Sequence, residues 1–275
     1  MTRIRNIAHR GLWNAKVPQN TIDAFRRAWA AGATWVETDF HHTAAGQMVC
    51  LHAEGELLRY SGCEKRIADL SPSDVATIRL DPERFSAGAR PGSIPEPDDS
   101  DPGPDAFRIP LLDEVLATVP PHGTLQAEIK GYSTQYADIF DGAARNAGLS
   151  EGNIVVSSFD FEALADFHAR KPTYRTLLLV GVPKNGDKDV LGIARKSAEA
   201  GFWAFCPGLC DGDRPLTPAE VGVIRASGLS FRVYGVNSPE ALRVAATLGA
   251  EAFTCNHWRR AFDWARDVPD LELLP

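Results

Sequence analysis

The chain has 275 residues, of which 44% are hydrophobic and 24% charged, and its formal net charge is −7. This composition is typical of a globular protein, and the length suffices for two ordinary domains or one large barrel. The negative charge excludes a broad nucleic-acid-binding surface, which requires a basic stripe. It allows a phosphate-bearing substrate, because one metal ion or a few buried cations reverse the charge locally.

Signals for export and membrane insertion are missing from the sequence. The N-terminal segment has no long apolar region of the kind that a signal peptide carries. No stretch approaches the roughly 18 apolar residues that a membrane-spanning helix needs. The five cysteines are odd in number and scattered, which fits reduced thiols better than a disulfide framework. We therefore expect a cytoplasmic protein without stable membrane insertion and without a nucleic-acid partner.

The first part of the chain predicts two strands, a helix between them and a hairpin arm. Ile4–His9 is expected to be a strand, Thr21–Ala31 a helix and Thr34–His41 the second strand. Met48–Leu51 is also extended and follows a two-residue turn. Because so short a turn cannot join parallel strands, we expect Met48–Leu51 to return antiparallel to the second strand.

A polar, proline-rich stretch comes next and predicts little regular structure apart from a short helix starting near Ser71. Its least patterned part is Asp81–Arg108. We interpret this part as a surface loop or partial lid over the active site, because strands and helices resume unchanged after it. The whole chain, residues 1–275, is accordingly predicted to be a single domain.

From Leu111 onward, strands alternate with helices of about ten residues, which implies parallel βαβ units. With the hairpin arm set aside, eight strand candidates remain. We predict an α/β fold, a (β/α)8 TIM barrel with a short loop and hairpin insertion after the second strand, and a doubly wound sheet is the alternative. The elements of this part are Leu111–Val119 (helix), Thr124–Lys130 (strand), Thr134–Ala147 (helix), Asn153–Ser158 (strand), Glu162–Arg170 (helix), Tyr174–Val180 (strand), Lys188–Ala200 (helix), Phe202–Pro207 (strand), Pro218–Ser227 (helix), Phe231–Val236 (strand), Pro239–Leu248 (helix) and Glu251–Cys255 (strand).

Polar side chains gather at the predicted ends of the first strands, where the catalytic groups of such barrels lie. Residues two apart in a strand point to one face, so neighbouring carboxylates fall together there and suit a hard cation, Mg²⁺ or Ca²⁺. Two histidines supply groups that exchange protons near neutrality. The alternative for Glu128 and Lys130 is a simple ion pair with each other. The clustered residues are His9, Arg10, Glu37, Asp39, His52, Glu128 and Lys130.

Several motifs follow one another in a fixed order along the chain. They are Ala8-His9-Arg10-Gly11, Pro18-Gln19-Asn20-Thr21, Glu37-Thr38-Asp39, His52, Ile109-Pro110-Leu111-Leu112 and Glu128-Ile129-Lys130. In this combination the chain resembles the glycerophosphodiester phosphodiesterase family, which is related to phosphatidylinositol-specific phospholipase C barrels. The resemblance covers nearly the whole chain and is densest over the first 130 residues.

The resemblance implies metal-dependent hydrolysis of a glycerophosphodiester to glycerol 3-phosphate and an alcohol, with one divalent cation, Mg²⁺ or Ca²⁺, as cofactor. It implies that His9 and His52 are the catalytic acid–base pair, without deciding which is the base. It also implies that Arg10 and Lys130 contact the substrate phosphate. The metal ligands that it implies are Glu37, Asp39 and Glu128.

Three positions depart from the family pattern. Gln19 stands where the family usually has a glutamate, and Ala53 where an aspartate usually follows the second histidine. Near the last strand the family often has Thr-Asp, and this chain reads Thr254-Cys255-Asn256. The departures leave three alternatives open: a cut that forms a cyclic phosphate, a sugar, nucleotide or lysophospholipid diester as substrate, and a barrel that only binds a phosphate ester.

Overall fold

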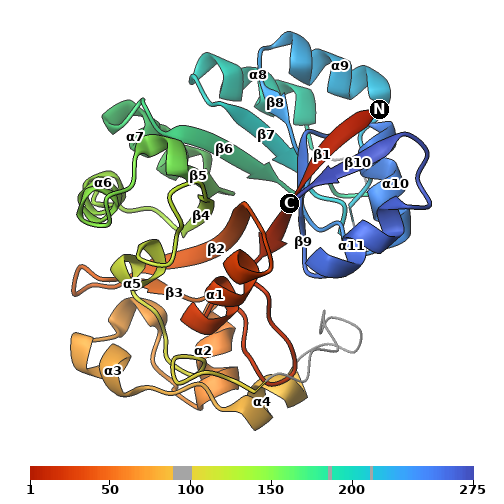
Figure 1. The fold of residues 1–275 in the computed structure, drawn as a ribbon. Helices are drawn as coiled ribbons and strands as arrows, with labels where there is room; N and C mark the ends of the chain where they lie inside the picture. The colour runs from red at the N-terminus through yellow and green to blue at the C-terminus, as the bar shows by residue number, and fades with distance from the viewer. Residues whose placement is uncertain (89–100, 185–187, 211–212) are drawn as a thin grey trace.

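The computed structural model describes residues 1–88, 101–184, 188–210 and 213–275. In these residues eight parallel strands form a nearly closed barrel, which confirms the predicted (β/α)8 fold (Figure 1). Strand β9 pairs with β1, and the bridge between Val233 and Phe253 closes the ring. The barrel strands are β1 (Thr2–His9), β2 (Trp35–His42), β4 (Thr124–Lys130), β5 (Ile154–Ser158), β6 (Arg175–Val180), β7 (Ala204–Pro207), β8 (Ser230–Phe231) and β9 (Ala252–Cys255).

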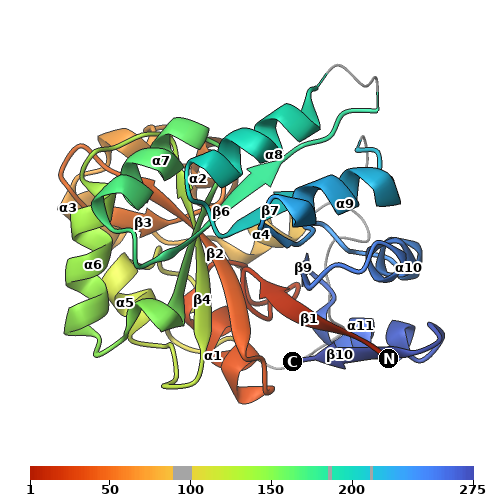
Figure 2. The same ribbon diagram turned by 90° about the horizontal axis from the view of Figure 1, so that it is seen from above.

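Helices cover the outside of the barrel and follow one another around it, as both ribbon views show (Figures 1 and 2). Their apolar faces and the outer side chains of the strands form the largest buried cluster, with Phe25, Phe40, Phe140 and Phe205 fully buried. These helices are α1 (Ile22–Ala30), α5 (Leu112–Leu116), α6 (Tyr136–Asn146), α7 (Phe161–Arg170), α8 (Val190–Glu199), α9 (Pro218–Ala226), α10 (Pro239–Thr247) and α11 (Trp258–Ala265), and a short 3-10 helix, Glu151–Asn153, precedes β5.

The inside of the barrel is filled by its own side chains. Ile7, Val155 and Leu177 are among the buried apolar residues there. At one end Arg232, only 6% exposed, has its guanidinium carbon 4.6 Å from the ring centre of Trp35 and 4.2 Å from that of Trp203. Two indole faces thus stabilise a buried cation that would otherwise pay a large desolvation cost.

The hairpin after the second strand is confirmed. Strand β3 (Met48–Cys50) runs antiparallel to β2, with Phe40 opposite Cys50. The chain then forms an insertion, whose elements α2 (Glu54–Ser61), the 3-10 helix Ile67–Asp69, α3 (Pro72–Thr77) and α4 (Pro82–Gly88) lie together beside β3 in Figure 1. The short helix near Ser71 is confirmed as α3, which Ser71 caps by accepting from the Asp74 amide.

Helix α2 was not predicted. Its N-cap is Ala53, whose side chain cannot accept a hydrogen bond, and Gly55 lies in its first turn. The sequence therefore lacks the usual signals of a helix start. Burial of Leu57 and Tyr60 against the insertion core stabilises the helix instead, and Gly62 ends it in the left-handed conformation.

Two further differences concern the insertion and the C-terminal part. Helix α4 occupies the start of Asp81–Arg108, which was predicted to be loop, whereas residues 89–100 lie outside the described residues. After β9 the chain adds α11 and the strand β10 (Leu271–Leu274), which pairs with β1 outside the barrel. The lid and the single domain stay predictions.

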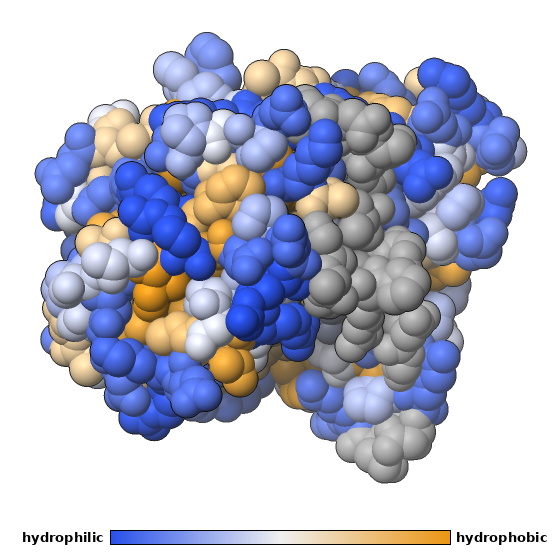
Figure 3. Space-filling view, turned by 90° about the horizontal axis from the view of Figure 1, so that it is seen from below, coloured by the Kyte–Doolittle hydropathy of each residue, from blue (hydrophilic) through white to orange (hydrophobic). Residues whose placement is uncertain are grey.

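The surface seen from below is mostly hydrophilic, with apolar residues showing in places between the polar ones (Figure 3). Among the helices in the described ranges, none combines the length and the apolar character needed to cross a bilayer.

Gly11 lies where the chain leaves β1 and turns back along α1. Its φ is +82°, and the following amide, of Leu12, donates to the Ala24 carbonyl at 2.9 Å. A Cβ at Gly11 would lie 2.6 Å from the Ala24 carbonyl carbon, which is closer than atoms can pack. This backbone contact sets how closely the helix approaches the end of the strand that carries His9.

We predict that Gly11→Ala destabilises the protein by roughly 2–5 kcal/mol, the sum of positive-φ strain and overpacking. Gly46→Ala is the matched control, because Gly46 also has a positive φ, +79°, but nothing lies within 4 Å of the added Cβ. It should cost only about 1 kcal/mol. Urea unfolding measures both variants, and equal losses would contradict the close-contact explanation.

Candidate active site

The register of the barrel strands brings the predicted site residues to one end of the barrel. His9 pairs with Glu37 across β1 and β2, and Asp39 pairs with Glu128 across β2 and β4. Glu37 and Asp39 are two residues apart and therefore share a face of β2. The hairpin arm β3 is followed at once by His52, beside the same strand end.

The loop between β1 and α1 is fixed to β2 by Asn20. Its side chain donates to Asp39 Oδ2 at 2.9 Å and accepts from the Thr38 hydroxyl at 3.0 Å. Arg10 and Asn20 both have a positive φ, near +60°, and the Asn20 amide donates to the Arg10 carbonyl at 3.1 Å. Thr21 then caps α1 by accepting from the Ala24 amide. Backbone strain is thus stored where Arg10 is presented to the site.

Glu37, Asp39 and Glu128 form a buried cluster whose carboxylate oxygens lie within 4.8 Å of one another. Glu37 Oε2 makes no hydrogen bond to any described residue, although it lies 3.6 Å from His9 Nε2. A buried carboxylate oxygen without a donor is unfavourable in a protein interior. All-oxygen ligands at this spacing fit a hard divalent cation such as Mg²⁺ or Ca²⁺.

Two cations of the chain partly neutralise this cluster. Arg10 Nε lies 3.0 Å from Asp39 Oδ2, and Lys130 Nζ lies 2.8 Å from Asp39 Oδ1 and 2.5 Å from Glu128 Oε1. Burial alone would raise the pKa of Asp39, but these two cations outweigh it and hold that pKa below its usual range. Asp39 is therefore ionised in the folded protein.

The other two carboxylates are less well neutralised. Burial, and then the charge of Asp39, raise the pKa of Glu37 well above its usual range. The same two causes raise the pKa of Glu128 to about 7. Arg10 and Lys130 thus do not suffice to keep all three carboxyls ionised, and a divalent cation bound there would stabilise the ionised forms of Glu37 and Glu128.

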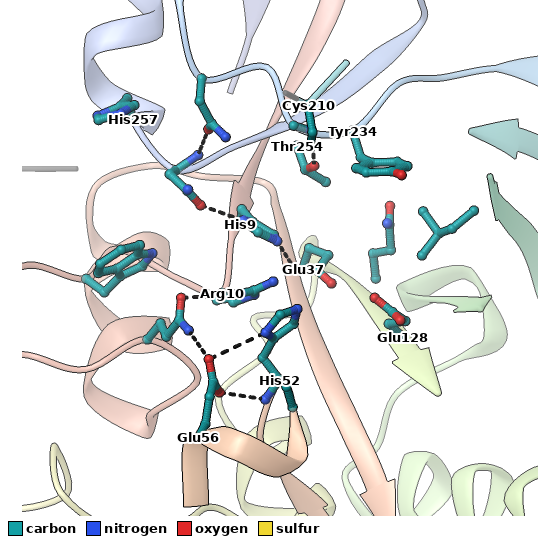
Figure 4. Close-up of a pocket in the computed structure, with 18 of the residues that line it drawn as sticks. His9, Arg10, Glu37, His52, Glu56, Glu128, Cys210, Tyr234, Thr254 and His257 are labelled. Atoms are coloured by element: carbon teal, nitrogen blue, oxygen red, sulfur yellow. Dashed lines mark hydrogen bonds and ion pairs between the residues drawn. The ribbon is translucent and has the colours of Figure 1, made fainter. Parts of the chain in front are cut away.

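His9 and His52 both reach the cavity beside this cluster, and each has a partner at Nδ1. His9 Nδ1 lies 2.5 Å from the amide oxygen of Asn256, whose backbone amide donates in turn to Asn237 at 2.8 Å. Burial, and then Arg10, lower the pKa of His9 to about 3. His52 Nδ1 lies 3.4 Å from Glu56 Oε1 on helix α2 (Figure 4).

Glu56 and Asn256 are the site residues that the sequence analysis missed as partners of the histidines. The signal for Glu56 was its spacing, four residues after His52, which places both on one side of a helix start. The sequence predicts no helix directly after His52, where only Ala53 was noted as a departure. The structure corrects this, because α2 begins at Glu54 and turns Glu56 back toward His52.

The cavity that these residues line has a volume of about 810 Å³. One wall comes from the insertion and the β1–α1 loop, with Trp13, Tyr60 and Phe85. The opposite wall comes from the loops after later strands, with Phe159 and Tyr234 in edge-to-face contact at 5.5 Å between ring centres. The labelled polar groups lie together in the cavity (Figure 4), whose lining also includes the aromatic side chains named above, a form suited to a small polar ester.

Five of the seven predicted site residues line this cavity together: His9, Arg10, Glu37, His52 and Glu128. Asp39 is fully buried beneath them. Lys130 forms ion pairs with Asp39 and Glu128, and its pairing with Glu128 is the alternative that the sequence left open. It also lines a smaller adjoining pocket. Its contact with a phosphate stays a prediction, as do the roles of the other six.

Comparison with known proteins agrees with the geometry. The profile of the Glycerophosphoryl diester phosphodiesterase family matches residues 9–259. A glycerophosphodiester phosphodiesterase of Bacillus altitudinis is 27% identical over 91% of this chain and 93% of its own, and one of Bacillus subtilis is 24% identical over 86% and 78%. The structure of an Oleispira antarctica phosphodiesterase, in complex with the product sn-glycerol-3-phosphate, superposes with a TM-score of 0.74 at 16% identity and covers 94% of this chain and 96% of that one.

We predict that Glu37→Gln abolishes binding of Mg²⁺ and Ca²⁺, measured by isothermal titration calorimetry. The same change should raise the melting temperature of the cation-free protein increasingly as the pH rises, because burial and Asp39 raise the pKa of Glu37 and its ionisation then destabilises the wild-type fold. Adding the cation should raise the melting temperature of the wild type, which binds it, but not that of Glu37→Gln.

Glu162→Gln is the control, because this glutamate is 76% exposed on α7 and pairs only with Lys196 among the described ion pairs. It should bind the cation like the wild type. Undiminished binding by Glu37→Gln would show that Glu37 is not a ligand.

Proposed function

The chain belongs to the glycerophosphoryl diester phosphodiesterase family, and from this premise we propose that it hydrolyses a small glycerophosphodiester to glycerol 3-phosphate and an alcohol. The observation that carries the proposal is the meeting of two oriented histidines with a buried three-carboxylate cluster in one cavity. The product bound by the Oleispira antarctica phosphodiesterase supports a glycerol phosphate as the retained half of the substrate.

Glu37, Asp39 and Glu128 would hold one divalent cation, Mg²⁺ or Ca²⁺. When bound, the cation would neutralise charge on the phosphate oxygens and polarise the phosphorus toward attack. Three oxygen ligands with no sulfur or imidazole among them favour these hard cations over zinc.

The chain's own groups account for the rest of the reaction. Arg10 lines the cavity, and its guanidinium would stabilise negative charge on a non-bridging oxygen of the phosphate. His9 and His52 would act as the acid–base pair, one removing a proton from the attacking water or hydroxyl and the other protonating the alcohol that leaves. Both rings have their partner at Nδ1, so Nε2 would carry out this exchange, and Nε2 of His9 lies 3.6 Å from Glu37 Oε2 beside the carboxylate cluster.

A small substrate is supported by the cavity, which is large enough for a glycerophosphodiester with a modest alcohol. The cytoplasmic location stays a prediction from the sequence.

We predict that the purified protein releases glycerol 3-phosphate from at least one member of a panel of small glycerophosphodiesters. Chelation should stop the release, and Mg²⁺ or Ca²⁺ should restore it. Phosphorus NMR of the products distinguishes direct hydrolysis from a cut that leaves a cyclic phosphate. Absence of release with every diester and both cations would contradict the proposal.

We further predict that His52→Ala lowers the turnover number by roughly 10²–10⁴-fold, the usual worth of a general acid or base, while cation binding measured by calorimetry persists. His42→Ala is the control, because His42 contacts Gln135 and Tyr136 rather than the cavity. It should keep the wild-type rate. An unchanged rate in His52→Ala would remove this histidine from the mechanism.

A further inference from the structure

Glu56 is a buried carboxylate on which three donor groups converge. It is only 6% exposed and lies in the first turn of α2. Its Oε2 accepts from the His52 backbone amide at 3.0 Å, and its Oε1 accepts from the Gln19 side-chain amide at 2.8 Å and lies 3.4 Å from His52 Nδ1. The amino-terminal end of the helix also favours a negative charge at this place.

Gln19 fits this arrangement because its amide can both donate and accept. Its NH₂ group donates to Glu56, and its oxygen accepts from Arg10 Nη1 at 3.2 Å. A glutamate at position 19 would place a second carboxylate against Glu56, since an ionised carboxylate has no hydrogen to donate. A continuous set of contacts thus runs from Arg10 through Gln19 to Glu56 and His52 (Figure 4).

We infer that Glu56 is the residue that positions His52 for catalysis, and that Gln19 is matched to it. This inference rests on the proposed function, and it accounts for two departures of the sequence together. Position 53 needs no aspartate, because Glu56 reaches His52 from one turn further along. Position 19 has an amide where the family usually has a carboxylate, because the carboxylate of this site now lies on α2.

The contact fixes which ring nitrogen of His52 carries hydrogen. Nδ1 lies 3.4 Å from a carboxylate oxygen, which favours the tautomer with the hydrogen on Nδ1 and leaves Nε2, at the far edge of the ring, as an acceptor. Figure 4 shows this far edge turned toward Glu37, on the cation side of the cavity. The insertion helix therefore sets the chemical state of a histidine that belongs to the barrel end.

Two variants separate positioning of His52 from simple support of the fold. In Glu56→Gln the amide offers one accepting oxygen to three donors, so both stability and turnover fall. In the double variant Gln19→Glu with Glu56→Gln, the amide at position 56 donates to the new carboxylate and still accepts from the His52 backbone. The network is then satisfied and stability returns, but His52 Nδ1 faces an NH₂ group and must give up its hydrogen.

We expect the double variant to melt like the wild type and to keep its KM, while its kcat stays about 10²–10⁴-fold lower, the usual contribution of a general acid or base; holding a catalytic histidine in the wrong tautomer in a serine protease costs about 10⁴-fold. Long-range ¹⁵N–¹H NMR spectra of histidine-labelled protein should show the Nδ1–H form of His52 in the wild type and the Nε2–H form in the double variant. Glu54→Gln is the control, because Glu54 accepts from the Ile67 amide on the other side of α2.

Recovery of kcat together with the melting temperature in the double variant would overturn the inference, and so would an Nε2–H form of His52 in the wild type. The NMR result stands whether or not any diester is cleaved. A wild type with the Nδ1–H form but no turnover would therefore count against the proposed function and in favour of the role of Glu56.

Discussion

The site depends on one buried charge, that of Asp39. Its side chain has no exposed surface, and its two oxygens meet three partners from two other segments: Arg10 and Asn20 in the β1–α1 loop, and Lys130 at the end of β4. An ionised carboxylate in such a place is tolerated only when cations and hydrogen-bond donors surround it, and loss of one partner is costly. The requirement fixes how β1, β2 and β4 meet, because any slip in register would separate Asp39 from these groups.

The pairing of Asp39 also affects His52, through a series of side-chain contacts rather than through the strands. Arg10 is shared between Asp39 and the Gln19 amide, and Gln19 connects it to Glu56 and so to His52. The backbone strain at Arg10 and the close contact at Gly11 are local costs of directing this arginine into the cavity. The barrel strands therefore supply the three carboxylates. The β1–α1 loop and the insertion supply the contacts that hold Arg10 and His52.

The sequence predicted the parts of the site that follow from strand geometry. The two-residue spacing of Glu37 and Asp39 places both on one face, and the short turn before Met48 dictates an antiparallel arm. What it did not reveal depends on packing between distant segments. Helix α2 lacks a capping side chain, so its start is stabilised by buried neighbours and not by local signals. Glu56 and Asn256 were missed as partners because a histidine's partner is chosen by the folded chain, and Asn256 lies 247 residues from His9.

The two histidines are fixed in the same way but by chemically different groups. An amide oxygen, such as that of Asn256, accepts a hydrogen bond from the His9 ring without adding charge. The carboxylate of Glu56 lies 3.4 Å from His52 Nδ1 and would also stabilise a positive charge on that ring. An acid–base pair requires two groups that respond differently to a proton, and similar side chains acquire that difference only from their surroundings. The departure at position 53 thus leaves His52 with an orienting partner, Glu56, and of the partners of the two histidines only this one is charged.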